Sequence, residues 1–256
     1  MLTITIYKIM VYLCVRRFKQ SLSIFMQRNR KMGSPEKIDI CKLCPHSQSC
    51  KANNDVFKKL EKTMITPEKG NFLFKQGETF DSFYIMCQGS AKAECKTTGN
   101  SPQVLEFYHP CDVIGLCGFG NGSYQETAQI MTYSRIYKVS KKDFDTALAH
   151  SPALAPLMFE LLGTSMVRRQ RALSEMSKLE AEERFLNFLK AEQSGVPKDS
   201  NGIELSMSRT DLANYLGVAV ETLSRLIKNL SQKGVIEVNN RHISLCVNTN
   251  KSCNAA

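Results

Sequence analysis

One stretch near the C-terminus, RTDLANYLGVAVETLSRLIKNL at residues 209–230, constrains the fold of this 256-residue chain more than any other. Its small and apolar positions have the spacing of two short helices that pack against each other. These positions are Leu212, Ala213, Leu216, Leu223 and Leu226. Gly217 lies between the two sets, where a tight turn favours a residue without a side chain. The spacing predicts a helix-turn-helix, and residues 233–243 (KGVIEVNNRHI) predict a hairpin wing after it.

The second of these helices carries a polar face. Glu221, Ser224 and Arg225 are spaced i, i+3 and i+4, so they share one exposed side of the helix. Arginine can donate two hydrogen bonds to guanine, glutamate can accept one from cytosine, and serine can bond to either base edge. We predict that this face contacts bases in double-stranded DNA, and that Arg209 and Lys228 contact phosphates. The alternative is an intrahelical Glu–Arg pair on a solvated surface.

The net charge of +10 is a weaker argument for DNA binding than these residues. Residues 1–40 hold eight Lys and Arg against two acidic residues, and so contribute +6 of the total. The same leader has an apolar stretch too short to span a membrane, and it lacks the order of a signal peptide. We therefore expect a cytoplasmic protein with no membrane contact. Translation could instead begin at Met26 or Met32.

Residues 65–139 contain short runs rich in β-branched and aromatic residues, separated by glycines. Examples are SFYIMCQG, QVLEFYHP and RIYKVS. Turn signals at intervals of about 8 to 12 residues predict an antiparallel sandwich or barrel. Before this region, the apolar residues between positions 53 and 63 predict a short helix.

A long helix is predicted to follow, with Ser151 and Pro152 as its N-cap and first residue. Its apolar positions step by four, three, four, seven and three, as in a helix that packs along a partner helix. These positions are Ala155, Phe159, Leu162, Met166, Leu173 and Met176. Arg169 occupies the remaining slot, where it would meet its counterpart in a second chain and weaken the dimer. The alternative is a single amphipathic helix packed on its own β domain.

Three cysteines, Cys41, Cys44 and Cys50, form a C-x2-C-x5-C run. Ten cysteines in 256 residues are too few for a disulfide scaffold and fit a reducing compartment. In that setting a tight cluster indicates metal binding or redox chemistry. A thioredoxin-like oxidoreductase is the alternative from another class, but the sequence lacks the strand-to-helix context that it needs. We therefore predict that the protein is not an enzyme.

The order of a glycine-punctuated β-roll, a heptad helix, a linker and a winged helix-turn-helix resembles the CRP/FNR family of bacterial transcription regulators. The resemblance covers about residues 41–247 and is most specific in LFKQGE (73–78), SKLEAEERFLNFL (177–189) and ETLSRL (221–226). It implies an α+β protein with a β-roll like a cyclic-nucleotide-binding jelly roll, a long dimerisation helix and a C-terminal winged helix-turn-helix. It also implies a homodimer that binds DNA and RNA polymerase.

On this basis the chain divides into a basic leader (1–40), a cysteine cluster with a β-roll (41–150), a dimerisation helix with a connector (151–194) and a winged domain (195–256). The E-x-x-S-R form of the second helix, together with the cysteine cluster, resembles the oxygen-sensing FNR branch. That branch implies an oxygen-labile [4Fe-4S] cluster that favours the DNA-binding dimer, and a dyad of TTGAT-like half-sites.

The chain departs from the cyclic-AMP branch of the family. That branch needs an acidic residue and an Arg-Ser pair in the β-roll to hold the ribose and the phosphate. This chain has Leu116 at the first position and Glu126–Thr127 at the second. A nucleotide phosphate would meet a carboxylate, which argues against a cyclic nucleotide as effector.

The chain also departs from the FNR branch. The resemblance places a fourth cysteine at the start of the last β-roll strand, where this chain has Tyr137. A cluster held by cysteines alone needs four of them. Cys117, in the glycine-rich loop GLCGFG, is the best substitute, and Cys111 is the second choice. The alternative is a regulator that responds to a small molecule or to thiol redox state, with no metal or with zinc held by the three clustered cysteines and His46 or Cys117.

Overall fold

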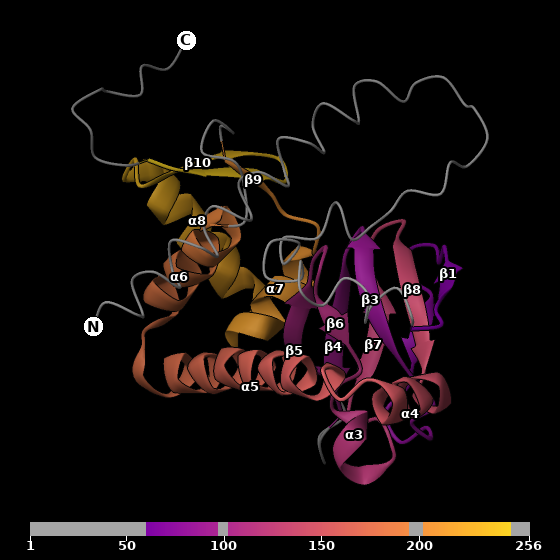
Figure 1. Ribbon diagram of the computed structural model, residues 1–256. Coiled ribbons are helices and arrows are strands. Elements are labelled where there is room, and N and C mark those ends of the chain that lie inside the picture. The colour runs from indigo at the N-terminus through magenta and orange to yellow at the C-terminus, as the bar shows by residue number, and fades with distance from the viewer. Residues whose placement is uncertain (1–59, 97–101, 195–201, 247–256) are drawn as a thin grey trace, which may run out of the picture. The chain divides into compact units, whose positions relative to one another are not determined.

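The computed structural model describes residues 60–96, 102–194 and 202–246 (Figure 1). The chain forms two compact units, and the boundary between them lies after Ser177. Most of the helix predicted for residues 53–63 falls outside the described residues, as does the cysteine run. Among the residues described, no helix is long and apolar enough to cross a membrane.

The first unit is built on two four-stranded antiparallel sheets (Figure 1). The strands are β1 (Thr63–Ile65), β2 (Phe72–Phe74), β3 (Ser82–Gln88), β4 (Ala91–Cys95), β5 (Gln103–Tyr108), β6 (Val113–Ile114), β7 (Thr127–Ile130) and β8 (Arg135–Ser140). One sheet has the strand order β1-β8-β3-β6, and the other has the order β2-β7-β4-β5. The antiparallel architecture that the glycine-separated runs predict is confirmed, and so is the β-roll that the resemblance implies.

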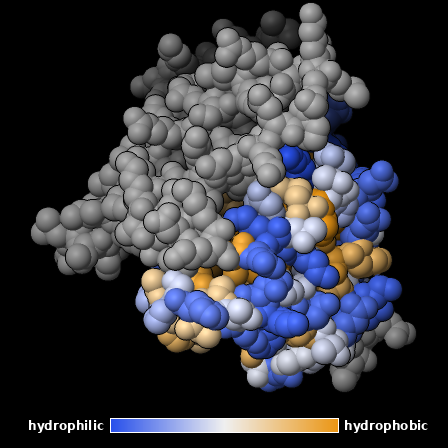
Figure 2. All heavy atoms as spheres, turned by 45° about the vertical axis from the view of Figure 1, so that its right-hand side comes forward, coloured by the Kyte–Doolittle hydropathy of each residue, from blue (hydrophilic) through white to orange (hydrophobic). Residues whose placement is uncertain are grey.

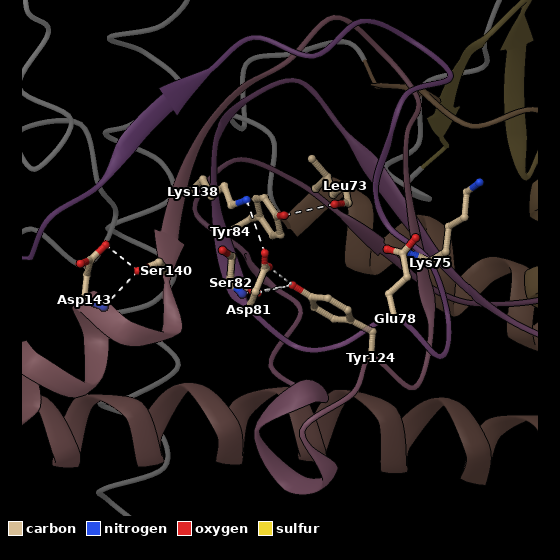
Figure 3. Close-up of polar contacts among 10 residues, drawn as sticks. All are labelled: Leu73, Lys75, Glu78, Asp81, Ser82, Tyr84, Tyr124, Lys138, Ser140 and Asp143. Carbon is tan, nitrogen blue, oxygen red and sulfur yellow. Dashed lines mark hydrogen bonds and ion pairs between the residues drawn. The ribbon is translucent and has the colours of Figure 1, made fainter.

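Aromatic side chains fill the space inside the roll. The rings of Phe74 and Tyr124 stack with their centroids 3.8 Å apart, and Tyr84 stacks on the other side of Phe74 at 5.9 Å. The hydroxyl groups of Tyr124 and Tyr84 find hydrogen-bond partners at the edge of this core (Figure 3). The hydroxyl of Tyr124 donates to the carbonyl of Ser82 at 2.6 Å, and that of Tyr84 donates to the carbonyl of Leu73 at 3.1 Å. These bonds tie the loop before β7 and the strand β2 to β3.

The described residues of this unit form three helices: α3 (Gly118–Asn121), α4 (Lys141–His150) and α5 (Leu154–Lys178). The sequence analysis did not predict α4. Its N-cap is Ser140, whose hydroxyl oxygen accepts a hydrogen bond from the backbone N–H of Asp143 at 3.0 Å (Figure 3). Phe144 anchors the helix, since its ring meets Phe83 of β3 edge-on at 5.4 Å.

Helix α5 begins later than the predicted helix. It begins at Leu154, because Ser151 and Pro152 form a tight turn in which the N–H of Leu154 donates to the carbonyl of Ser151 at 3.0 Å. It ends at Lys178, two residues before the next helix. At this break, the guanidinium of Arg184 donates to the backbone carbonyl of Leu179 at 2.6 Å and gives that carbonyl a hydrogen-bond partner.

In the second unit, the described residues form three helices and a three-stranded antiparallel sheet with the order β10-β11-β9 (Figure 1). These elements are α6 (Ala181–Ser194), β9 (Ile203–Glu204), α7 (Arg209–Leu216), α8 (Val220–Gln232), β10 (Ile236–Asn239) and β11 (His242–Leu245). Ser208 caps α7, and Gly217 ends it in the left-handed conformation with φ of 67°. The predicted helix-turn-helix and its hairpin wing are both confirmed.

On the face shown in Figure 2, hydrophilic side chains predominate and hydrophobic ones form small groups among the residues that are coloured. Large exposed apolar side chains of the described residues are concentrated on α5, where Phe159, Met166, Val167 and Leu173 are each more than half exposed. Contiguous exposed apolar surface of this kind commonly marks an interaction site.

Candidate functional site

The helix-turn-helix presents one polar face of α8 to solvent. On its buried side, Leu223, Ile227 and Leu230 enter the core of the second unit. Leu226, which the sequence analysis took as the second anchor, is half-buried, and Ile227 and Leu230 have that role instead. The register of α8 is therefore fixed by three side chains at helical spacing.

The four residues of α8 predicted to contact DNA all lie on the opposite side and are exposed. They are Glu221, Ser224, Arg225 and Lys228. The hydroxyl of Ser224 donates to the carbonyl of Val220 at 2.9 Å, so it offers mainly its lone pairs to a partner. Glu221 and Arg225 both belong to the N-terminal half of α8, the part that contacts bases in this motif. Base contact itself stays a prediction.

Arg209 lies at the first position of α7 and is half-buried. Its Nη2 donates to the carbonyl of Asn240 at 3.5 Å, a long hydrogen bond to the turn of the β10–β11 wing. Asn240 has a positive φ of 55°, which asparagine tolerates better than most residues. Burial lowers the pKa of Arg209 from its ordinary value. Arg209 thus links α7 to the wing, and its predicted phosphate contact stays a prediction.

A second polar site lies inside the first unit. It brings together three carboxylates and two guanidiniums. Two of the carboxylates lie in the β-roll and the third in the turn after β5, and both guanidiniums belong to neighbouring residues of α5. We call the following residues the buried charge cluster: Glu106, Asp112, Glu126, Arg168 and Arg169. Glu126 and Glu106 are only 1% and 8% exposed, respectively. Carboxylates with so little access to water need charged or hydrogen-bonding partners.

Arg169 is the main partner of Glu126. Its Nη2 lies 2.7 Å from Oε2 of Glu126 and 3.4 Å from Oε2 of Glu106. The same nitrogen donates to the hydroxyl of Tyr108 at 3.3 Å, and that hydroxyl donates to Oε1 of Glu126 at 3.2 Å. Burial alone would lower the pKa of Arg169, but the carboxylate of Glu126 offsets this and holds the pKa above its ordinary value. Arg169 therefore stays charged.

Arg168 neutralises the other side of the cluster. Its Nη1 donates to Oδ1 of Asp112 at 2.8 Å, and its Nε lies 3.0 Å from Oε1 of Glu106. The carboxylate oxygens of Glu106 are buried and receive no well-directed hydrogen bond from any described residue. Glu106 is thus held by charge attraction rather than by aimed donors.

These contacts correct the expectation for Arg169. The heptad repeat placed it in the seam, where it would face its counterpart in a second chain without a partner. Instead, the guanidinium lies within its own chain against Glu126 and Glu106. The repeat predicts which side of a helix is apolar, but it does not predict that a long side chain at the border will turn towards a buried carboxylate. The sequence analysis missed Glu106, Tyr108 and Arg168 for the same reason.

Burial raises the pKa of Glu106 above its ordinary value of 4.5, although Arg168 and Arg169 act in the opposite direction. Glu106 therefore takes up a proton more readily in the folded state than in the unfolded chain, and its contribution to stability falls as the pH rises through the raised pKa. We expect Glu106 to lower the free energy of unfolding of the wild type progressively as the pH rises above 4.5. Glu106→Gln should flatten this fall, and Glu160→Gln on the exposed side of α5 should not. Denaturant unfolding at a series of pH values checks this; superimposable profiles for wild type and Glu106→Gln would refute it.

Cys117 lies at the N-cap of α3 and is half-buried. Burial raises the pKa of its thiol to about 11, and the neighbouring carboxylate of Glu126 acts in the same direction. Metal ions are bound by thiolate rather than thiol. A metal at Cys117 would therefore have to offset this raised pKa to bind the thiolate, and the role of Cys117 as a ligand stays a prediction.

The other cysteine positions of the sequence analysis lie elsewhere. Cys111 is half-buried in the turn before β6, with φ of 79°, and its N–H donates to the carbonyl of Met86 at 2.7 Å. Tyr137 lies in β8 opposite Met64 and Ile85, and the ammonium of Lys62 is 5.2 Å from its ring centre. The described part of the chain contains no group of three or more His, Cys, Asp or Glu residues that could hold a metal ion.

Comparison with known proteins agrees with both units. Residues 65–151 match the cyclic nucleotide-binding domain family, and residues 183–247 match the Crp-like helix-turn-helix domain family. The transcriptional activator protein FnrA of Stutzerimonas stutzeri is 29% identical over 181 residues, which are 70% of this chain and 74% of that protein. The chain belongs to the CRP/FNR family of bacterial transcription regulators.

Other members of the family are similar over the same extent. The fumarate and nitrate reduction regulatory protein of Escherichia coli K12 is 28% identical over 184 residues, covering 70% of this chain and 72% of that protein. The structure of FixK2 from Bradyrhizobium japonicum superposes with a TM-score of 0.67 at 21% identity, covering 73% of this chain and 93% of that one. This CRP/FNR member is therefore a DNA-binding transcription regulator, and its relatives are regulators rather than enzymes.

Proposed function

We propose that this CRP/FNR member is an FNR-like homodimeric regulator that binds a dyad DNA site and senses oxygen or redox state through an iron–sulfur cluster. The observation that carries the DNA-binding part is the exposed face of α8, where Glu221, Ser224 and Arg225 are available together. Arginine and glutamate on one face suit the two partners of a G·C pair. We expect two TTGAT-like half-sites, about one helical turn apart.

The apolar stripe of α5 supports the dimer. Phe159 and Met166 are both 72% exposed, and Leu173 is 68% exposed. These three side chains recur every seven residues along one side of the helix, which is the repeat of a two-helix seam. Met176 is also exposed, whereas Leu162 and Arg169 are half-buried towards their own unit. The proposed seam therefore rests on Phe159, Met166, Leu173 and Met176.

The cysteine run and the activators named above support the cluster. Cys41, Cys44 and Cys50 supply three thiolates of the four that a [4Fe-4S] cluster takes from protein. When bound, such a cluster would supply the oxygen-sensitive group of the protein. We propose Cys117 as the fourth ligand, with Cys111 as the second choice.

The interior of the roll supports the argument against a cyclic nucleotide. Glu126 occupies the position where the cyclic-AMP branch has its phosphate-binding arginine, and it is already paired with Arg169. A phosphate at this place would add a negative charge beside Glu106 and Glu126 in a site with little access to water. The effector is therefore unlike the nucleotide after which the domain family is named.

Anaerobic purification followed by iron, sulfide and zinc analysis tests the cluster. We expect a coloured protein with iron and acid-labile sulfide in equal amounts, and loss of both in Cys44→Ser. Cys117→Ser should lose them as well, and Cys111→Ser should keep them. A colourless protein with stoichiometric zinc would reject the iron–sulfur cluster and favour the alternative, a regulator that responds to a small molecule or thiols. Loss of iron in Cys111→Ser but not in Cys117→Ser would reverse the assignment of the fourth ligand.

A further inference from the structure

The buried charge cluster joins elements that are distant in sequence. Glu106 lies in β5, Asp112 in the turn after it and Glu126 immediately before β7, whereas Arg168 and Arg169 lie in the middle of α5. Among the described residues, the ion pairs of these two arginines cross from the helix to the β-roll. The cluster therefore connects the roll to α5. The proposed role in DNA binding does not explain why the chain has this connection.

Without α5, the carboxylates of the cluster would have no positive charge of the cluster beside them. The roll contributes three carboxylates, from Glu106, Asp112 and Glu126, and the two guanidiniums that lie against them both come from α5. Glu126 is 1% exposed and Glu106 is 8% exposed, so water cannot replace the arginines at low cost. Tyr108, which is also buried, adds its hydroxyl between Arg169 and Glu126. The site is built to hold a cation that reaches it from α5.

The remaining contacts of α5 do not determine its position in the same way. Its first turns are apolar: Leu157, Met158 and Leu161 line a small cavity together with Phe83 and Ile85 of β3. Apolar packing of this kind is non-directional and tolerates small rotations of a helix about its axis. A guanidinium restricts both the rotation and the height of the helix, because its Nη2 must stay within reach of Glu126, Glu106 and the hydroxyl of Tyr108 at the same time.

We propose that Arg169, supported by Arg168, is a tethered cation that occupies the interior site of the β-roll and so fixes the rotation and register of α5. This electrostatic latch determines how the stripe of Phe159, Met166 and Leu173 is presented. Because that stripe is the dimer seam of the proposed function, the latch links the state of the roll to dimerisation. Arg169 acts here as a positioning residue, through the helix that carries it.

Two single variants and their combination test the latch in the full chain. In Arg169→Met and Glu126→Gln, we expect amide hydrogen exchange across residues 162–177 and in β7 to accelerate by about tenfold or more, the scale of a coupling between paired groups. The double variant Glu126→Gln/Arg169→Met should regain much of the protection, because it leaves no unpaired buried charge. Arg169→Lys should fall between wild type and Arg169→Met, since a point charge makes fewer directed bonds.

Arg171→Met is the matched control. Arg171 is two residues further along α5, with a side chain that is 66% exposed and paired with Glu175 at 2.8 Å on the helix surface. Its loss should leave exchange unchanged. If Arg169→Met exchanges like Arg171→Met, or if the double variant is as unprotected as the single ones, the latch is wrong. Should the single variants fail to fold, a folded double variant supports the latch and an unfolded one overturns it.

Sedimentation of the same variants separates the latch from the proposed function. We expect Arg169→Met and Glu126→Gln to dimerise about tenfold more weakly than wild type, and the double variant to recover. A wild type that stays monomeric under every condition refutes the dimer, yet the exchange experiment still decides whether Arg169 positions α5. Unchanged dimerisation in the single variants, with accelerated exchange, would refute the link between latch and seam.

Discussion

Arg225→Ala is expected to weaken binding to the dyad site by about 1 to 3 kcal/mol and to relax the preference for one G·C pair in each half-site. Arg225 is exposed in the N-terminal half of α8, on the same face as Glu221. Its guanidinium can form two bonds to a guanine edge, and alanine can form neither. Binding measured against a panel of half-sites with single substitutions will show both effects.

Lys228→Ala is the matched control for this prediction. Lys228 is exposed one turn further along α8, and an ammonium there suits a phosphate rather than a base. Its loss should weaken binding to all half-sites to a similar degree and reduce the dependence on salt. If Arg225→Ala also weakens every half-site alike and keeps the base preference, the assignment of α8 as the base-contacting helix is wrong.

Leu223→Ala should destabilise the second unit by about 2 to 5 kcal/mol, the range for removing a leucine side chain from a packed core. Leu223 is fully buried and faces the core shared by α7 and α8. Leu226→Ala is the control. Because Leu226 is only half-buried, its replacement should lower the free energy of unfolding by less. Denaturant unfolding followed by a probe in the winged domain measures both. Equal losses would mean that the register of α8 differs from that described.

The helix-turn-helix could be predicted from sequence because its determinants are local. The cap at Ser208, the left-handed residue Gly217 and the leucines lie within one short segment, and each acts on its near neighbours. The β-roll was predictable for a similar reason, since strand alternation and turn residues are short-range signals. Helix α4 had a comparable signal in Ser140 and Asp143, which the sequence analysis overlooked.

The buried charge cluster could not be predicted from the same kind of pattern. Glu126 and Arg169 are 43 residues apart in the chain, and neither has a neighbour that reveals its partner. A charged residue in a heptad repeat indicates a weak point in a seam unless a carboxylate lies within its reach. That information exists only in the packing of α5 on the roll. For the fourth cluster ligand, likewise, the sequence ranked Cys117 by its loop, but the pKa of its thiol depends on burial and on Glu126.

Binding of the full chain to a dyad of TTGAT-like half-sites, measured first without oxygen and then after exposure to air, tests the central proposal most directly. We predict a dimer that binds the dyad anaerobically and loses most of its affinity in air together with its iron and sulfide. The single half-site should bind far more weakly under both conditions. Equal affinity for the dyad before and after exposure to air would contradict an oxygen-sensing, FNR-like regulator.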